Sequence, residues 1–362
     1  MGSSRMITLC YMHIFFLVLL TQCLSLYQNL RFNWTSGDIL HTPLAKTIRD
    51  HQSVCTPKVY YFHQNNWGMG SDLHTWTQAV CNSMEKKATL LELSEGWIWN
   101  DRKFCGTGPT LPKRQPLSCY FNVEQHCPDS TTFPDKMMSY NHSYDRCPTY
   151  IQDDRTRQDF RAAAIEYLFS NISSKLIKAA ESEITTVFGD YGIPDNMITV
   201  HLRWGDKKRE MKLVTQQEYV DAIAAIAKSN NITHPKVFVT TESKDALSKI
   251  EVYVRDHQPT WTIYNYPPSV YDDRPRHHHT IASSPMSMAQ NTNGAIGKAS
   301  LIALLLALEA RYYVLTSGSN WSRLIDELRR NVLDYKCGNC TKMVDLRQAF
   351  SDHNWRRLLY SD

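Results

Sequence analysis

The stretch Ile198-Thr-Val-His201-Leu-Arg203-Trp-Gly-Asp206-Lys207 changes within a few positions from an apolar, β-branched run to a cluster of charged residues. β-Branched residues favour strands, and continuous apolar strands are typical of parallel sheets that helices cover on both faces. The carboxyl ends of such strands are where an open α/β sheet exposes its ligand site. We therefore predict a buried parallel strand that carries the guanidinium of Arg203 to an anion-binding edge.

The amino terminus contains a long apolar run. Residues 6–26 carry no charge and follow Arg5, and their length is close to the roughly 20 residues that a membrane-spanning helix needs. A cation on the N-terminal side favours a cytoplasmic tail, residues 1–5, and a type II signal anchor. Cys23-Leu-Ser25 also resembles a small-residue cleavage site, so a cleaved signal peptide and a secreted protein are the alternative.

Cysteines and glycosylation sequons both indicate the secretory pathway. Of the ten cysteines, eight follow the apolar run, and six of those lie between residues 55 and 147. We expect disulfides in this first half and a local disulfide in Cys337-Gly-Asn-Cys340, with a redox or zinc pair as the alternative. Six Asn-x-Ser/Thr sequons begin at Asn33, Asn141, Asn171, Asn231, Asn320 and Asn339.

The rest of the chain is longer than one hydrophobic core comfortably supports, which predicts two domains. We expect a stem at 27–55, a disulfide-tied α/β domain with linking helices at 56–190, a second Rossmann-like domain at 191–335 and a tail with the CxxC pair at 336–362. The net charge of +4 is too small to indicate a nucleic-acid partner.

The first half predicts one βαβ step: a strand at 58–63, a loop at 68–72, a helix from Leu73 to about Lys86 and a strand at 88–93. Ser71 or Asp72 could cap the helix. Gly68 and Gly70 in the loop would let backbone N–H groups approach a phosphate, although two glycines also mark ordinary tight turns.

The second half alternates between strands and helices, which predicts a parallel sheet and an α/β fold. Apolar residues at helical spacing from Arg155 to about Thr186 predict a linking helical region. The expected strands end at Arg203 or cover 236–241, 261–264 and 312–315, and the expected helices cover 217–228, 244–255, 297–309 and 321–330.

A family resemblance rests on four ordered blocks. His201-x-Arg203-x-x-Asp206-Lys207, followed by Glu210 and Tyr219, resembles the first motif of the α-1,6-fucosyltransferases that modify N-glycan cores. The α-1,2- and protein O-fucosyltransferases share a looser form. The other blocks, similar in order and spacing, are Gly68-x-Gly70-x-x-Leu73-His74 with Thr89–Glu92, Val237–Lys244, and Thr316–Leu328.

The resemblance extends from about Lys58 to Leu333, with departures at three positions. Trp204 and Gly205 stand where the family has Arg and Thr, and Ala303 aligns near an Asp that family members use for the guanine base. The departures leave the donor class better supported than the linkage.

The resemblance implies a GT-B glycosyltransferase, in which two Rossmann-like domains face a cleft and the domain at 191–335 binds GDP-β-L-fucose. It implies inversion at the anomeric carbon with neither metal nor cofactor. The expected reaction is fucose transfer to a glycan hydroxyl, α-1,6 on the N-glycan core, with α-1,2- or protein O-fucosylation as alternatives. A further alternative is a catalytically inactive, lumenal glycan-binding or scaffolding protein of the same fold.

Together with the apolar N-terminal run, this interpretation predicts a Golgi membrane protein of type II topology with a lumenal catalytic domain. Its expected partners are GDP-fucose, a glycan or glycoprotein acceptor and the membrane around the anchor, and a homodimer is possible.

Three residues carry the expected chemistry. Arg203 can hold two diphosphate oxygens with its planar fork and neutralise the leaving GDP, and Lys207 adds positive charge there. Glu210 is the expected general base, which takes the proton of the acceptor hydroxyl. The alternatives are a salt bridge for Arg203, a solvated loop for Lys207 and an ordinary surface position for Glu210.

The remaining expected site residues surround this clamp, and each also has a structural alternative. Those expected to bind the donor are His201, Ser319, Gly68, Gly70 and Tyr219, for which a buried histidine, a helix cap, tight turns and packing are the alternatives. Those expected to support the site are Asp206, Glu242, Ser243 and Arg323. The run Arg274-Pro-Arg-His-His-His279 predicts a mobile loop rather than a metal site, because consecutive histidines point in different directions.

Overall fold

The computed structural model describes residues 29–34, 39–92, 97–106, 116–123, 135–138, 147–204, 212–266 and 285–346. Strands and helices alternate along most of these ranges, so the protein has an α/β fold. One sheet of three strands comes from the first half and one sheet of five strands from the second, and the neighbouring strands in both sheets are parallel. The predicted α/β class with parallel sheets is confirmed.

The larger sheet has the strand order β6-β5-β4-β7-β8. The opening stretch of the sequence analysis forms β4, which lies at the centre, and the strand order reverses there. The carboxyl ends of β4 and β7 therefore flank a topological switch point, the place where open α/β sheets bind ligands. The strands are β4 (Met197–His201), β5 (Lys236–Thr240), β6 (Thr262–Asn265), β7 (Tyr312–Leu315) and β8 (Lys342–Asp345).

Helices cover both faces of this sheet. Successive side chains of β4 point to opposite faces, so they contact different helices. Ile198 and Val200 share a buried cluster with residues of α8 (Gln216–Ser229) and α9 (Lys244–His257). On the opposite face, the hydroxyl of Thr199 donates a 2.7 Å hydrogen bond to the last residue of α11 (Ala295–Ala307). The same face packs against α12 (Asn320–Leu328).

In the smaller sheet, β1 (Lys58–Phe62) lies between β2 (Thr89–Glu92) and β3 (Asp135–Met138). Helix α3 (Met69–Glu85) connects β1 to its parallel neighbour β2, so the predicted βαβ step is confirmed. Strand β3 was not predicted, because residues 97–150 contain no strong periodic pattern.

Helix α3 begins at Met69, so the loop predicted for residues 69–72 is wrong. The N-cap is Gly68 rather than Ser71 or Asp72. The carboxylate of Asp72 is buried and accepts hydrogen bonds from the backbone N–H of Trp67 (2.9 Å) and the indole N–H of Trp97 (2.7 Å). The carboxylate that was predicted to cap the helix therefore accepts hydrogen bonds from Trp67 and Trp97 instead.

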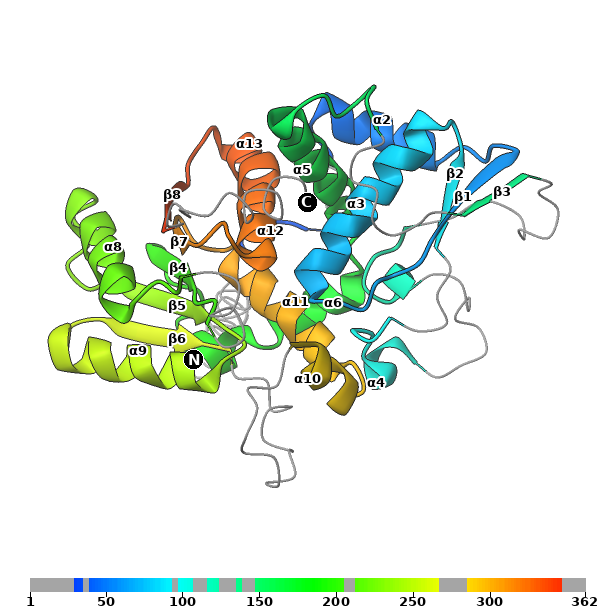
Figure 1. The fold of residues 1–362 in the computed structure, drawn as a ribbon. Helices are drawn as coiled ribbons and strands as arrows, with labels where there is room; N and C mark the ends of the chain where they lie inside the picture. Colours follow the sequence, from blue (N-terminus) through cyan, green and yellow to red (C-terminus); the bar gives the residue numbers. More distant parts are fainter. Residues whose placement is uncertain are drawn as a thin grey trace, which may run out of the picture.

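Helices also link the two sheets, as predicted for the region from Arg155 to Thr186. They are α5 (Asp154–Ser170), α6 (Ser174–Glu181) and α7 (Ile184–Phe188). In Figure 1, α3, α5, α11 and α12 lie between the five-stranded sheet on the left and the three-stranded sheet on the right. The shorter helices are α4 (Arg102–Cys105), the 3-10 turn η2 (Pro116–Cys119) and α10 (Pro285–Asn291).

The described part of the predicted stem belongs to the folded body. Helix α2 (Pro43–Gln52) packs against α5, and Leu30, Trp34 and Ile39 are buried in the main core. Apolar side chains spaced through this segment give it a core-facing side, which a stem that stands apart from the domain does not need.

The predicted C-terminal tail also contributes to the fold. After α12 the chain forms the π-helical segment η6 (Arg329–Asp334) and the short helix α13 (Tyr335–Cys337), and it then enters β8, which pairs in parallel with β7. The expectation of a tail from residue 336 is therefore corrected for residues 342–345.

Disulfides form where the cysteine pattern predicts them. The bonds are Cys81–Cys147, Cys105–Cys119 and Cys337–Cys340. Cys55 is also disulfide-bonded. The first half is thus covalently tied, as its cysteines predicted.

Within the described ranges, none of the helices combines the length and the apolar character that a membrane crossing requires. The predicted signal anchor, residues 6–26, lies outside those ranges.

Candidate functional site

Tyr219 of α8 connects the carboxyl ends of β4 and β7 through its hydroxyl group. Its hydroxyl donates to the carbonyl of His201 (3.2 Å) and lies 3.1 Å from the hydroxyl of Thr316. The side chain is 1% exposed, and burial raises the pKa of Tyr219 to about 12. The sequence predicted that Tyr219 binds the donor, with packing as the alternative. Its hydroxyl contacts His201 and Thr316 within the fold.

His201 connects β4 to the first turn of α12. Its Nδ1 lies 2.7 Å from Oγ of Ser322, which also accepts a 3.2 Å hydrogen bond from the backbone N–H of Thr316. Burial, with a smaller effect from the charge of Arg203, lowers the pKa of His201 to about 3. The imidazole is therefore neutral near pH 7, and its contacts are those of the buried, hydrogen-bonded histidine that stood as the alternative.

Arg203 leaves the sheet just after β4 and forms an ion pair with Glu242, which follows β5. The guanidinium also donates to the backbone carbonyl of Trp204 (3.0 Å). The side chains of Arg203 and Glu242 are 11% and 23% exposed, so solvent reaches the pair at the sheet edge. We call Arg203 and Glu242 the edge pair. The salt bridge that stood as the alternative for Arg203 is thus present, and Arg203 still lies at the predicted edge of the sheet.

The residues next to the edge pair have structural contacts. The indole N–H of Trp204 donates to the carbonyl of Val214 (2.9 Å), which holds the ring against the segment that leads to α8. Ser243 is the N-cap of α9, and its hydroxyl accepts from the N–H of Ala246 (3.2 Å). Ser243 therefore has the capping role that stood as its alternative.

Helix α12 begins at the same sheet edge, directly after β7. Ser319 is its N-cap and is buried, and within the described part of the chain its side chain makes no capping hydrogen bond. The capping alternative for its hydroxyl is therefore not observed. The first backbone N–H groups of a helix carry partial positive charge, which favours anions at this point. Arg323, one turn further on, donates to Oδ1 of Asn320.

The first turn of α3 lies against the first turn of α12. A Cβ on Gly70 would approach the backbone nitrogen of Trp321 to 3.1 Å, so a small residue is needed at that contact. The hydroxyl of Ser71 accepts a 2.5 Å hydrogen bond from Nδ2 of Asn320. Gly70, which suggested a phosphate-binding loop, is thus also needed for the close packing of α3 against α12.

A buried polar cluster behind this contact joins α3, α5 and α12. Nε2 of His74 donates to Glu327 (3.1 Å), and Nε of Arg161 donates to the other carboxylate oxygen of Glu327. Burial would raise the pKa of Glu327, but the charge of Arg161 and the hydrogen bonds outweigh it and lower that pKa to about 2. Burial lowers the pKa of His74. We call these three residues the joint.

The sequence reasoning did not find the joint. His74 and Glu327 lie within two of the family-like blocks, but they are 253 positions apart and no local pattern pairs them. Arg161 lies in the buried stretch from Phe160 to Phe169, where Glu166 is the other charged residue, and that burial of charge was the available signal.

Several predicted residues lie outside the described ranges. These are Asp206, Lys207 and Glu210, and the loop from Arg274 to His279. The expected general base and the second cation therefore stay predictions.

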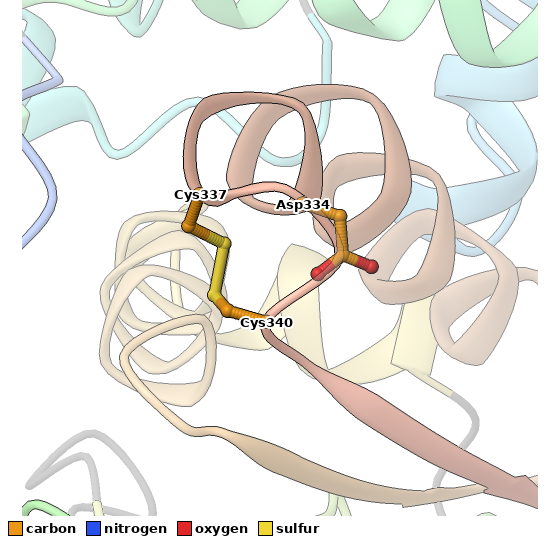
Figure 2. Close-up of side chains that lie close together, drawn as sticks. All are labelled: Asp334, Cys337 and Cys340. Carbon is orange, nitrogen blue, oxygen red and sulfur yellow. A yellow bond between two sulfur atoms is a disulfide. The ribbon is translucent and has the colours of Figure 1, made fainter.

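One cluster of potential metal ligands occurs in the described ranges, and it consists of Asp334, Cys337 and Cys340. Figure 2 shows that the two sulfur atoms are bonded to each other. Asp334 accepts hydrogen bonds from Arg329 (2.6 Å) and from the backbone N–H of Thr341 (2.9 Å). Because disulfide sulfurs are not thiolate ligands, the cluster is a disulfide-closed turn, which confirms the predicted local disulfide.

No protein-family model matches this chain, and no curated protein matches it in sequence. Arg203 and the N-terminus of α12 meet the same edge of a parallel sheet beside its switch point. Such an edge can bind a compact anion such as a diphosphate.

Proposed function

We propose that this protein is an inverting glycosyltransferase that transfers L-fucose from GDP-fucose to a glycan hydroxyl. The observation that carries the proposal is the place of Arg203, at the carboxyl end of β4 and next to the strand that leads into α12. In a sheet with this strand order, that place is where nucleotides bind. The identity of the transferred sugar, fucose, is proposed from the fucosyltransferase-like blocks.

In the proposed reaction, the diphosphate lies against Arg203 and the N-terminus of α12. The acceptor hydroxyl oxygen forms a bond to the anomeric carbon while the bond from that carbon to the GDP oxygen breaks. The electron pair leaves with GDP, whose added charge the guanidinium neutralises. Glu210 accepts the hydroxyl proton, and Lys207 adds a second positive charge beside the leaving group.

The proposal includes a GT-B arrangement, in which the half with the three-stranded sheet supplies the acceptor side. Transfer to the N-glycan core in α-1,6 linkage is the form that the blocks favour, and α-1,2 or protein O-fucosylation are its variants. The disulfides and the sequons support a lumenal location, and with the apolar N-terminal run they support a type II Golgi membrane protein.

A second candidate is a lumenal glycan-binding protein of the same fold that does not turn over a donor. The specific observation in its favour is the edge pair, because Glu242 already neutralises Arg203. The donor must then compete with a carboxylate for the guanidinium. A guanidinium carries five N–H donors, more than one carboxylate uses, so the two partners are compatible in principle.

Donor turnover separates the two candidates. The full chain is incubated with GDP-fucose, GDP-mannose and UDP-galactose in the presence of a chelator, with a mixture of N-glycans as acceptors, and GDP or UDP release is measured. We expect release from GDP-fucose, with a strong loss in Arg203→Ala and none in Arg255→Ala, an exposed arginine on α9. Absence of turnover with every donor would contradict the enzyme proposal.

A further inference from the structure

The first described residues of the chain are fixed at the side of the five-stranded sheet where its strands begin, which we call the amino edge. The backbone N–H of Arg31 donates a 2.8 Å hydrogen bond to Glu309, which comes shortly before β7. The guanidinium of Arg31 pairs with Asp195 (3.3 Å), which comes shortly before β4. Leu30 and Trp34 are 7% and 2% exposed. The core therefore already includes Leu30.

The connection from the predicted signal anchor to this edge is short. The apolar run ends at Leu26, and Leu30 follows four residues later. Even a fully extended chain covers at most about 14 Å over four residues. The headgroup layer on one side of a bilayer accounts for about 5–8 Å of that reach. Because the rest is less than the roughly 10 Å diameter of one helix, the residues that cover Leu30 must lie at the headgroups if the run spans the bilayer.

The surface around this point carries side chains that suit a bilayer interface. Tyr191 is 90% exposed and lies two residues before the carbonyl group to which the guanidinium of Arg31 donates. Nζ of Lys336 lies 5.3 Å from the centre of the Phe32 ring, and the neighbouring Tyr335 is 58% exposed. Tyrosine is enriched at the level of the headgroups, where its ring and its hydroxyl both find a suitable environment.

The charges of this surface do not select anionic lipids. Arg31 is paired with Asp195, and the exposed side chains of Asp190 and Lys336 carry opposite signs. The contact therefore depends on the short connection and the exposed tyrosines, and its partner is a neutral, zwitterionic bilayer surface.

We propose that the amino edge lies against the headgroups of the membrane that holds the predicted signal anchor, with Tyr191 and Tyr335 at headgroup level. The inference rests on the type II anchor of the proposed function but not on its chemistry. It also orients the candidate site. Strand β4 is five residues long, so about 17 Å separates the amino edge from the carboxyl edge that carries Arg203. The site faces away from the bilayer, and acceptors reach it from the lumen.

Lipid crosslinking tests the contact. The full chain is placed in phosphatidylcholine nanodiscs that contain a phospholipid with a photoreactive diazirine on its headgroup. Mass spectrometry then locates the lipid adducts and shows whether residues 1–26 are still present. Two variants carry an insertion of about 5 or about 20 glycine and serine residues between Tyr27 and Gln28, which adds an average reach of about 12 or 25 Å. Release of GDP from GDP-fucose is measured on the same samples.

In the wild type we expect adducts on residues 29–32, 189–196 and 335–336 to be at least about tenfold more frequent than on residues 241–246 at the carboxyl edge, because the length of the strands separates the two edges. The short insertion lowers the frequency at the amino edge about twofold and the long insertion at least about fivefold, because the folded body can then leave the headgroups.

Equal adduct frequencies at the two edges overturn the proposal, and so does a frequency at the amino edge that the insertions leave unchanged. Loss of residues 1–26 from the mature chain overturns it as well, since nothing then holds the amino edge at a membrane. Donor turnover is scored separately. GDP release without adducts at the amino edge refutes the membrane contact alone, and such adducts without GDP release refute the enzyme proposal alone.

Discussion

The joint and the edge pair both contain an arginine and a glutamate, but they differ in their surroundings. In the joint the side chains of Arg161 and Glu327 are 10% and 1% exposed, and His74 completes the set. At the edge, those of Arg203 and Glu242 are 11% and 23% exposed. A buried carboxylate cannot lose its partner without a large desolvation cost, whereas a solvent-reached carboxylate can. The joint therefore holds helices together, and the edge pair remains able to exchange a partner for a ligand.

Removal of the buried carboxylate tests the structural side of this comparison and has the largest expected effect. In Glu327→Ala, the buried guanidinium of Arg161 loses the carboxylate of its ion pair, which lowers the free energy of unfolding by about 3–5 kcal/mol. Urea denaturation measures the change. The matched control is Asp245→Ala, which breaks an exposed pair with Lys249 on α9 and changes that free energy by about 0.5 kcal/mol or less. Equal effects of the two substitutions would contradict the account.

The joint also predicts a pH dependence. The pKa of Glu327 is depressed from 4.5 to about 2 in the folded protein. The stabilisation is therefore present above about pH 4.5 and is lost as the pH falls toward 2. Over this window the wild type loses about 3 kcal/mol relative to Glu327→Gln. Denaturation of both proteins at pH 7, 4 and 2.5 measures the difference, and a difference that does not change with pH would show that Glu327 is not ionised in the fold.

The edge pair predicts a loss of binding without a comparable loss of stability. We expect Arg203→Ala to lower the affinity for GDP about 100-fold, because a charge-assisted bidentate contact is removed. The free energy of unfolding falls by less than in Glu327→Ala, by about 1–2 kcal/mol, because solvent reaches the carboxylate that is left. Arg203→Lys keeps the charge but lacks the planar fork, so its affinity lies between the two. Titration calorimetry with GDP measures all three proteins, and equal affinities would refute the clamp.

The smallest effect concerns the contact that brings the joint's helices together. Gly70→Ala places a Cβ 3.1 Å from the backbone nitrogen of Trp321, and we expect a net loss of about 1 kcal/mol, since the strain exceeds the helix preference of alanine. At Gly68 the nearest atom to an added Cβ is 3.9 Å away, so Gly68→Ala loses only N-cap preference, about 0.5 kcal/mol. Thermal unfolding compares the two, and a larger loss at Gly68 would contradict the packing argument.

The sequence predicted the strands and helices whose apolar runs are bounded by clear turn residues. The strand ending in the motif forms β4, and the apolar run of α11 was recognised as a buried helix. The pattern missed α2 and β8, which lie in segments read as a stem and a tail. It also placed the start of α3 too late, because Met69-Gly-Ser-Asp72 has the composition of a loop although tertiary contacts make it helical.

The site was predictable where side chains follow strand ends. Arg203, Glu242 and Ser319 lie at the carboxyl edge of the sheet, since parallel strands bring their ends together. The joint was not predictable, because Arg161 and Glu327 are 166 positions apart and only the packing of α5 on α12 brings them into contact. Periodicity reports which face of a helix is buried, but not which buried charge meets which.

Hydrogen exchange of the full chain with and without saturating GDP tests the central claim most directly, because it locates the ligand. If the edge pair and the N-terminus of α12 form the nucleotide site, amides of residues 200–204 and 316–323 exchange more slowly with GDP, while those of α2 do not change. Protection elsewhere without protection at these two segments, or no protection at all, would contradict the account.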